Sequence, residues 1–252
     1  MFKKYKINFD LDDPRATLAH RDIIVSKPFL KKLYTQWYEQ FLKAVERVPP
    51  GKYLEIGSGG GFLKNVFPAV ITSDILSLPN VDMIFSAEDL PFGENELSAI
   101  MMLNVFHHIP RPDKFLKEAE RTLVPGGRIV MIEPANSLLG RFIYKHLHHE
   151  DFDEAAGRTI KPGNPLTSSN QALPFIYFER DVHLFNSDFP NLKIISVKYH
   201  TPFLYALSGG VSRSALLPYF MYPFVTALEW LLRPVARQLG LFCTVEIEKT
   251  GR

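Results

Sequence analysis

The stretch Glu55-Ile56-Gly57-Ser58-Gly59-Gly60-Gly61-Phe62 decides the fold of this chain. It follows directly on a short apolar run, Tyr53–Ile56, whose composition is typical of a buried strand. Glycines at the point where a strand turns toward a helix let a ligand approach the backbone, and the free N–H groups of the helix start can bind it. The stretch therefore predicts a ligand-binding turn at the end of a strand, with a tight structural turn as the alternative.

Two acidic residues indicate which ligand this turn takes. A dinucleotide-binding turn that starts at Gly57 would need Gly or Ala at position 62, where this chain has Phe62. Glu55, two residues before the first glycine, suits a ligand with an ammonium group and would repel a pyrophosphate. Asp74 comes nineteen residues after Glu55, at the end of the next strand, where nucleotide-binding α/β folds place an acid on the ribose hydroxyls.

Strands alternate with helices on both sides of this turn. The helix predicted with the clearest amphipathic pattern covers Pro112–Val124, and Ser26–Val48 is a second one, for which Ser26 is a plausible N-cap. The connection between Ile75 and Val81 is too short for a helix. Alternation of this kind predicts an α/β domain with a mostly parallel sheet covered on both faces. The predicted strands are Tyr53–Ile56, Ala69–Ser73, Val81–Phe85, Leu97–Leu103, Arg128–Ile132, Leu192–Tyr199 and Phe242–Glu248.

The bulk composition narrows the class further. The 252 residues are 46% hydrophobic and 22% charged, as in a globular domain, and a net charge of +2 gives no support to a nucleic-acid partner. One cysteine, Cys243, excludes an internal disulfide framework and a multi-cysteine zinc site. The segment Met1–Asp13 is charged and has no apolar core, so we expect no signal peptide and a cytoplasmic location.

The run Tyr53–Pro134 resembles the class I methyltransferases that depend on S-adenosylmethionine (SAM), in the small-molecule branch that includes the quinone-biosynthesis enzymes. The glycine turn, Asp74, the Ser86–Phe92 motif and the Asn104–Pro110 motif follow in the order and spacing of that family. The resemblance implies a Rossmann-like fold with a seven-stranded sheet whose final strand is antiparallel. It also implies three parts: an N-terminal helical lid (1–50), a SAM-binding core (51–135), and an acceptor-side cap that includes the last two strands (136–252).

The same resemblance assigns the cofactor site. It places the methionine part of SAM against Gly57, Ser58 and Gly59, with Glu55 near the amine. It also implies roles for six further positions, which contact the ribose, the adenine or the sulfonium: Asp74, Ile75, Ser86, Ala87, Glu88 and Asn104. Relatives often have an acid in place of Ser86, a neutral and weaker acceptor, so Glu88 or Asp89 is a candidate to replace it.

The catalytic residues are less defined. A general base is needed only when the methylated atom carries a proton, and the weak candidates are His107, His108 and His149. A similar histidine pair recurs in this branch as a packing motif, which is the stronger interpretation of His107 and His108. The cluster His146–Asp153 matches no metal-binding spacing, so we expect no metal site and favour contact of His149 or Glu150 with the substrate.

The apolar stretch Leu216–Leu231 is too short and too interrupted by Pro218 and Pro223 to span a membrane. Packing on the sheet is the favoured interpretation, and peripheral contact with a membrane is the alternative. The sequence thus predicts SAM-dependent methylation of a small apolar, aromatic or lipid-like acceptor. A SAM-binding protein without turnover, a nicotinamide-dependent oxidoreductase and a protein or RNA methyltransferase are the alternatives, and the oligomeric state is left open.

Overall fold

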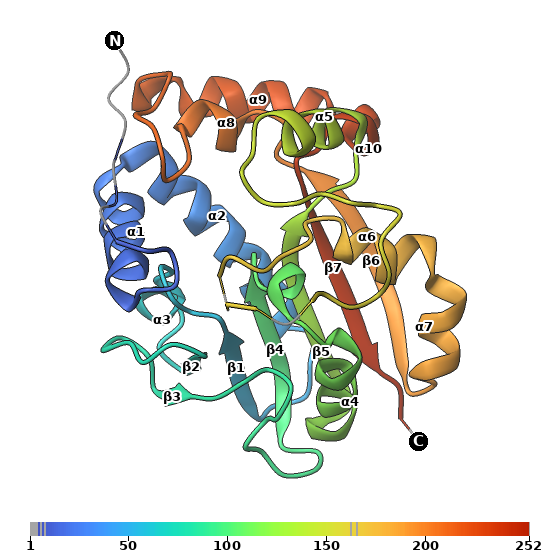
Figure 1. Ribbon diagram of the computed structural model, residues 1–252. Coiled ribbons are helices and arrows are strands. Elements are labelled where there is room, and N and C mark those ends of the chain that lie inside the picture. Colours follow the sequence, from blue (N-terminus) through green and yellow to red (C-terminus); the bar gives the residue numbers. More distant parts are fainter. Residues whose placement is uncertain (1–4, 6, 8, 162, 165, 252) are drawn as a thin grey trace.

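The computed structural model describes residues 5, 7, 9–161, 163–164 and 166–251, and contains a seven-stranded sheet with the order β3-β2-β1-β4-β5-β7-β6 (Figure 1). Parts of the predicted lid and cap, residues 1–4, 6, 8, 162, 165 and 252, lie outside the described residues. Among the strands that the structure describes, only β7 runs antiparallel to its neighbours, so the predicted fold is confirmed. The strands are β1 (Lys52–Ile56), β2 (Val70–Asp74), β3 (Met83–Ile84), β4 (Leu97–Leu103), β5 (Leu123–Pro134), β6 (Leu192–His200) and β7 (Phe242–Lys249).

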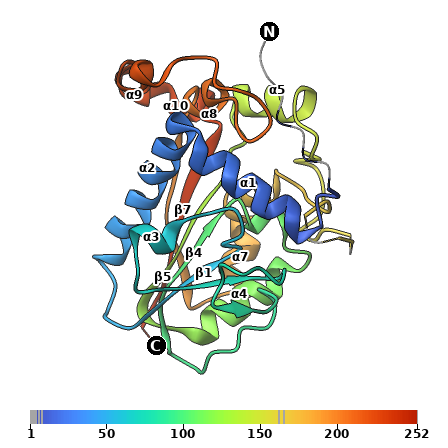
Figure 2. The same cartoon turned by 90° about the vertical axis from the view of Figure 1, so that its left-hand side faces the viewer.

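The core lies on both faces of the sheet because successive side chains of a strand point to opposite faces. On β5, Ile129 and Met131 pack on one face, while Val130 and Ile132 pack on the other. The first face is covered by α4 (Pro112–Thr122), α6 (Leu173–Phe175), the π-helix η2 (Ile176–Arg180) and α7 (Val182–Asp188). The second is covered mainly by α2 (Pro28–Val45), α3 (Leu63–Val66) and α8 (Leu204–Ser208). Figure 2 shows α2 and α4 on opposite sides of the strands.

Two helices precede the sheet where the sequence predicted one. Asp13 caps α1 (Pro14–Ser26) through its carboxylate, which accepts from the N–H of Arg15, and Pro14 occupies the first helical position. Ser26 is therefore the last residue of α1 and not the predicted N-cap of the next helix. Lys27 is extended and separates the two helices, because the residue before Pro28 avoids the helical conformation.

The cap carries the remaining short helices. They are α5 (Leu138–His146), η3 (Tyr219–Met221), α9 (Tyr222–Leu231), η4 (Arg233–Val235) and α10 (Ala236–Leu239), together with η1 (Phe106–His108) at the end of β4. The favoured prediction that Leu216–Leu231 packs on the sheet is wrong for most of the segment. Only Tyr222 and Val225 of α9 are buried, because α9 lies along the outer edge of the molecule beyond α8 (Figure 1). Among the described residues, no helix is both long enough and apolar enough to cross a membrane.

Candidate functional site

A cavity of about 350 Å³ opens at the carboxyl ends of β1, β2 and β4. Ligands of open α/β sheets bind at the carboxyl ends of the strands, where the strand order reverses direction. In this sheet the reversal lies between β1 and β4. All ten residues predicted for the cofactor site line this one cavity: Glu55, Gly57, Ser58, Gly59, Asp74, Ile75, Ser86, Ala87, Glu88 and Asn104. Their common location is a geometric finding, and the contact of each with a cofactor stays a prediction.

The glycine turn exposes its backbone to the cavity because side chains are excluded from it. Gly57 has a φ of +67°, and a Cβ atom there would lie 2.4 Å from Cγ2 of Val105. At Gly61, a Cβ atom would lie 2.7 Å from the hydroxyl of Tyr38. Both positions therefore require glycine for steric reasons, and the turn can approach a ligand closely.

Glu55 has a buried carboxyl group, and one of its two oxygen atoms lacks a hydrogen-bond partner among the described residues. The residue is 3% exposed, and the unpaired atom is Oε2. Burial raises the pKa of Glu55 to about 7, against the opposing effect of a hydrogen bond with Ser58. An unpaired buried carboxyl group is costly, so this atom favours a ligand that brings a hydrogen-bond donor or a positive charge.

Asp74 connects the glycine turn to β2. Its Oδ2 atom accepts from the N–H of Gly59 at 3.0 Å, and its Oδ1 atom accepts from the N–H of Leu76 at 2.9 Å. Burial raises its pKa, which these backbone hydrogen bonds counteract. Each carboxylate oxygen retains further acceptor capacity, so Asp74 can still accept from ligand hydroxyl groups.

The residues that follow β3 form another side of the cavity. The Ser86 hydroxyl accepts from the N–H of Glu88 at 3.2 Å. The Glu88 carboxylate accepts from the N–H of Arg111 at 3.0 Å and lies 3.6 Å from Nζ of Lys114. The Glu88 side chain is thus engaged by the start of α4, which leaves its backbone for a ligand, and Asp89 does not line the cavity.

Ile75 and Asn104 complete the cofactor side of the cavity. The side chain of Ile75 is largely exposed, with the residue at 49%, and offers an apolar surface next to Asp74. Asn104 has a φ of +57° and a buried Oδ1 atom without a hydrogen-bond partner among the described residues. A non-glycine residue in this conformation at the end of β4 is uncommon and is held by the N–H of Asn104, which donates to the carbonyl of Ile132 at 2.9 Å.

The N-terminal helices cover the glycine turn. On α2, Tyr34 and Tyr38 line the cavity, and the Tyr38 hydroxyl accepts from the N–H of Phe62 at 3.0 Å. Trp37 does not line it but packs against Phe242 in the core. The structure also brings in three α1 residues that the sequence analysis missed: Thr17, His20 and Ile24.

The cap contributes Tyr205 of α8 and Val211 of the following loop to the cavity wall. No spacing or motif marks either residue in the sequence. The α1 residues, in contrast, could have been found, because Asp13-Pro14 is a helix-start signal.

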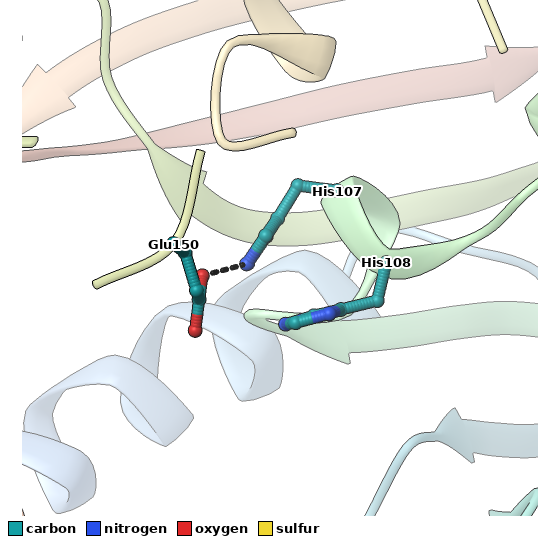
Figure 3. A group of neighbouring side chains, drawn as sticks. All are labelled: His107, His108 and Glu150. Carbon is teal, nitrogen blue, oxygen red and sulfur yellow. Dashed lines mark ion pairs between the residues drawn. The ribbon is translucent and has the colours of Figure 1, made fainter. Parts of the chain in front are cut away.

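His107 lies outside the cavity lining, in a buried group of charged residues at the end of β4. Its Nδ1 atom is 2.6 Å from Oε2 of Glu133. Its Nε2 atom is 3.3 Å from Oε2 of Glu150, the contact drawn as a dashed line in Figure 3. The other Glu133 oxygen accepts from the N–H groups of Val105 and Phe106. Burial lowers the pKa of His107, but the two carboxylates outweigh it and raise the pKa to about 9.

The other two candidate bases, His108 and His149, differ in whether they reach the cavity. His108 lines the cavity, and burial together with the charge on His107 lowers its pKa to about 4. Its Nδ1 atom lies 3.3 Å from the carbonyl oxygen of Ser168, which can only accept, so the proton belongs on Nδ1 and the Nε2 lone pair stays free. The side chain of His149 is 65% exposed and outside the cavity lining, and Glu150 also lies outside it, so the geometry does not support the predicted contact of either residue with the substrate.

His107, His108 and Glu150 also place three metal-ligating atoms within 4.8 Å of one another (Figure 3). However, both ring nitrogens of His107 already contact carboxylates, and a metal ligand must be a neutral imidazole. The ion pairs account for this cluster without a cation, and the absence of a metal site stays a prediction.

The fold is that of the class I SAM-dependent methyltransferases. A SAM-dependent methyltransferase from Thermotoga maritima superposes with a TM-score of 0.52 at 17% identity, covering 94% of this chain and 100% of that one. Residues 54–131 match the family model of a methyltransferase domain, so the chain carries that domain. The predicted class and its cofactor, SAM, are thereby confirmed at the level of the domain.

Two sequence relatives extend this match. A Methanocaldococcus jannaschii protein of uncharacterised function is 32% identical over 114 residues, which are 41% of this chain and 56% of that protein. The chain thus spans little more than half of that relative. The ubiquinone/menaquinone biosynthesis C-methyltransferase of Geotalea daltonii is 22% identical over 174 residues, covering 59% of this chain and 72% of the enzyme.

Proposed function

We propose that this protein is a SAM-dependent methyltransferase that acts on a small acceptor of apolar, aromatic or lipid-like character. The observation that carries the proposal is the unpaired carboxylate of Glu55 beside a side-chain-free glycine turn, inside a methyltransferase domain. A nicotinamide dinucleotide would bring a pyrophosphate to this carboxylate, which the charge disfavours, whereas SAM brings an ammonium group.

The cofactor residues have separate tasks in this proposal. The backbone of Gly57 and Gly59 holds the methionine part, Glu55 pairs with its ammonium group, and Asp74 accepts from the ribose hydroxyls. Ile75 packs beside the adenine. When bound, SAM supplies a methyl group on a sulfonium, a reaction that chiefly needs positioning and exclusion of water.

The remaining cavity wall indicates the acceptor. The part contributed by the N-terminal helices and the cap includes the aromatic and aliphatic side chains of Ile24, Tyr34, Leu166, Tyr205 and Val211, with Thr17, His20 and Tyr38 as further polar groups. Such a wall binds an apolar molecule by excluding water from it. The name of the Geotalea relative, a quinone-biosynthesis enzyme, supports an acceptor of the same character.

His108 is the residue that we assign to proton removal. It is the one imidazole among the three predicted candidates that lines the cavity, and its lowered pKa keeps it neutral at physiological pH. A neutral Nε2 can accept a proton as the methyl group arrives, but the same lowered pKa makes it a weak base, so it suits an acceptor whose proton is itself acidic. Replacing His108 with Asn should lower the turnover number and leave binding of S-adenosylhomocysteine unchanged.

The first test is calorimetric titration with S-adenosylhomocysteine. We expect micromolar binding by the wild type and its loss in Asp74→Ala and Gly57→Val. Asp82→Asn is the matched control, because the Asp82 carboxylate accepts from the N–H and hydroxyl of Thr72 in the middle of β2 but does not line the cavity. No binding by a folded wild type would refute the proposed cofactor site.

The second test is transfer of a labelled methyl group from SAM to a panel of hydroxylated naphthoquinones and catechols. Acceptor-dependent release of S-adenosylhomocysteine supports the enzyme. Tight binding of S-adenosylhomocysteine without transfer to any apolar acceptor would favour the SAM-binding protein without turnover.

A further inference from the structure

The cap has an outer face that is apolar where a soluble protein is usually polar. We call it the cap face; it consists of the exposed side of α5, the segment 216–235 and α10. Phe220, Phe224 and Trp230 are 69%, 65% and 60% exposed. The other exposed apolar residues of this face are Leu138, Phe142, Leu216, Tyr219, Leu228, Leu231 and Val235. Figure 1 shows α9, α5 and α10 along one edge of the molecule, and α10 contacts α5.

The orientation of α9 is the reverse of that of an ordinary surface helix. Its one charged residue, Glu229, points inward and accepts from the N–H groups of Phe203 and Leu204, where it caps the start of α8. Its exposed positions are all apolar: Pro223, Phe224, Ala227, Leu228, Trp230 and Leu231. A surface helix normally solvates its polar side, so this arrangement indicates an apolar environment outside the protein.

Basic residues outnumber acidic ones in the two segments that build the cap face. Segments 135–148 and 199–245 contain five Arg or Lys residues, and Glu229 is the single carboxylate in either segment. Two of these cations are paired, Lys145 with Glu154 and Arg237 with Glu179. Arg141, Arg213 and Arg233 form no ion pair with a described residue and remain as the net positive charge of this part of the chain. Arg233 is exposed and forms no ion pair with a described residue, which leaves its guanidinium free for a ligand.

We propose that the cap face binds the surface of an anionic lipid bilayer. Aromatic and aliphatic side chains would enter the headgroup boundary, and the surrounding cations would contact lipid phosphates, as in interfacial amphipathic helices. A second copy of the chain fits less well, because a symmetric contact would bring two basic faces together. This binding does not depend on methyl transfer and goes beyond the proposed function.

The cap face also adjoins the cavity. Tyr205 lines the cavity from α8, and α8 contacts α9 directly. An acceptor dissolved in the bilayer would therefore be separated from the cavity only by the α8 layer of the cap.

The proposal is tested by flotation of the purified protein with phosphatidylcholine vesicles that contain or lack phosphatidylglycerol. We expect binding to the anionic vesicles that weakens as salt is raised. The double variant Phe224→Ser with Trp230→Ser should bind roughly 100-fold more weakly, because two large apolar side chains no longer enter the bilayer. Arg233→Glu should weaken binding roughly tenfold, and on anionic vesicles only.

The matched controls are Ile195→Ser on β6 and Lys117→Glu on α4, both exposed and outside the cap face. They should bind vesicles as the wild type does. None of these residues lines the cavity, so calorimetry with S-adenosylhomocysteine and thermal unfolding should be unchanged in every variant and report separately on the cofactor site and the fold. Absence of vesicle binding by the wild type, or a dimer that the double variant converts to a monomer, would overturn the proposal.

Discussion

The Nδ1 atom of His107 lies 2.6 Å from Oε2 of Glu133, and both side chains are almost completely buried, at 3% and 0% exposure. The raised pKa of His107 means that this contact is an ion pair within the protein. It lies where β4 ends, directly beside the loop that borders the cavity, so it fixes the position of the neighbouring His108.

Replacement of His107 with Ala should destabilise the protein by roughly 3–5 kcal/mol, because the carboxylates of Glu133 and Glu150 lose the cation between them. Urea denaturation measures the change. His149→Ala, which removes an exposed imidazole, should stay within about 0.5 kcal/mol of the wild type. A loss at His107 no larger than the loss at His149 would show that the buried pair is not charged.

The same ion pair predicts a pH dependence of stability. The pKa of His107 is raised from 6.5 to about 9 on folding, so its contribution is fully present below pH 6.5 and is lost as the pH rises through 9. The difference in unfolding free energy between the wild type and His107→Ala should therefore shrink over this range. Denaturation of both proteins at a series of pH values measures it, and a constant difference would contradict the assignment.

Binding of S-adenosylhomocysteine should release protons near pH 7. Burial raises the pKa of Glu55 to about 7, and the ammonium group of the ligand would favour the ionised form. Calorimetry in buffers of different ionisation enthalpy measures the release. Glu55→Gln should abolish it and weaken binding roughly 10- to 100-fold, the effect of one charge-assisted hydrogen bond.

The control for that experiment is Glu88→Gln. Glu88 also lines the cavity, but its carboxylate is engaged by Arg111 and Lys114. It should retain both the affinity and the proton release of the wild type. Equal effects at Glu55 and Glu88 would show that neither carboxylate meets the ammonium group.

The contact between the glycine turn and Val105, just after β4, can be tested with a paired substitution. Gly57→Ala should destabilise the protein by more than the roughly 1–2 kcal/mol of a left-handed residue, because the new Cβ atom also meets Val105. Adding Val105→Ala should recover the part of the lost unfolding free energy that comes from the clash with Val105. The part that comes from the left-handed backbone conformation should remain. Denaturation of the single and double variants measures both, and the absence of any recovery would place the strain elsewhere.

Chelators should leave the protein unchanged. Because the ring nitrogens of His107 contact carboxylates on both sides, we expect EDTA to alter neither the melting temperature nor binding of S-adenosylhomocysteine. Added Mn²⁺ or Zn²⁺ should also leave the melting temperature in place. A rise that His107→Ala or Glu150→Gln removes would instead identify the cluster as a cation site.

The sheet and the cofactor side could be predicted because their signals are local. Apolar runs mark the strands within a few residues, and the glycine turn must have small residues at Gly57 and Gly61 for steric reasons. Asp74 follows from its place at the end of the second strand. Such features depend on the order of residues along the chain, which the sequence displays directly.

The other side of the site depends on contacts between distant segments. Tyr205 meets the cavity because α8 packs beneath α9 and against α2, and no spacing in the sequence encodes this. The buried group around His107 joins residues from β5 and from the segment after α5. The prediction for Leu216–Leu231 failed for a related reason: apolar composition shows that a helix avoids water, but not whether protein or another apolar phase covers it.

The place of β7 between β5 and β6 constrains how the protein is made. During synthesis, β6 emerges before β7 but pairs with no other described strand, so it must wait until residues 242–249 have left the ribosome. Until then the apolar edge of β5 is also open to other chains, as unpaired strands are prone to aggregation. Folding of this half of the sheet is therefore completed only after translation of the last strand, and a stalled or truncated chain would expose two strand edges at once.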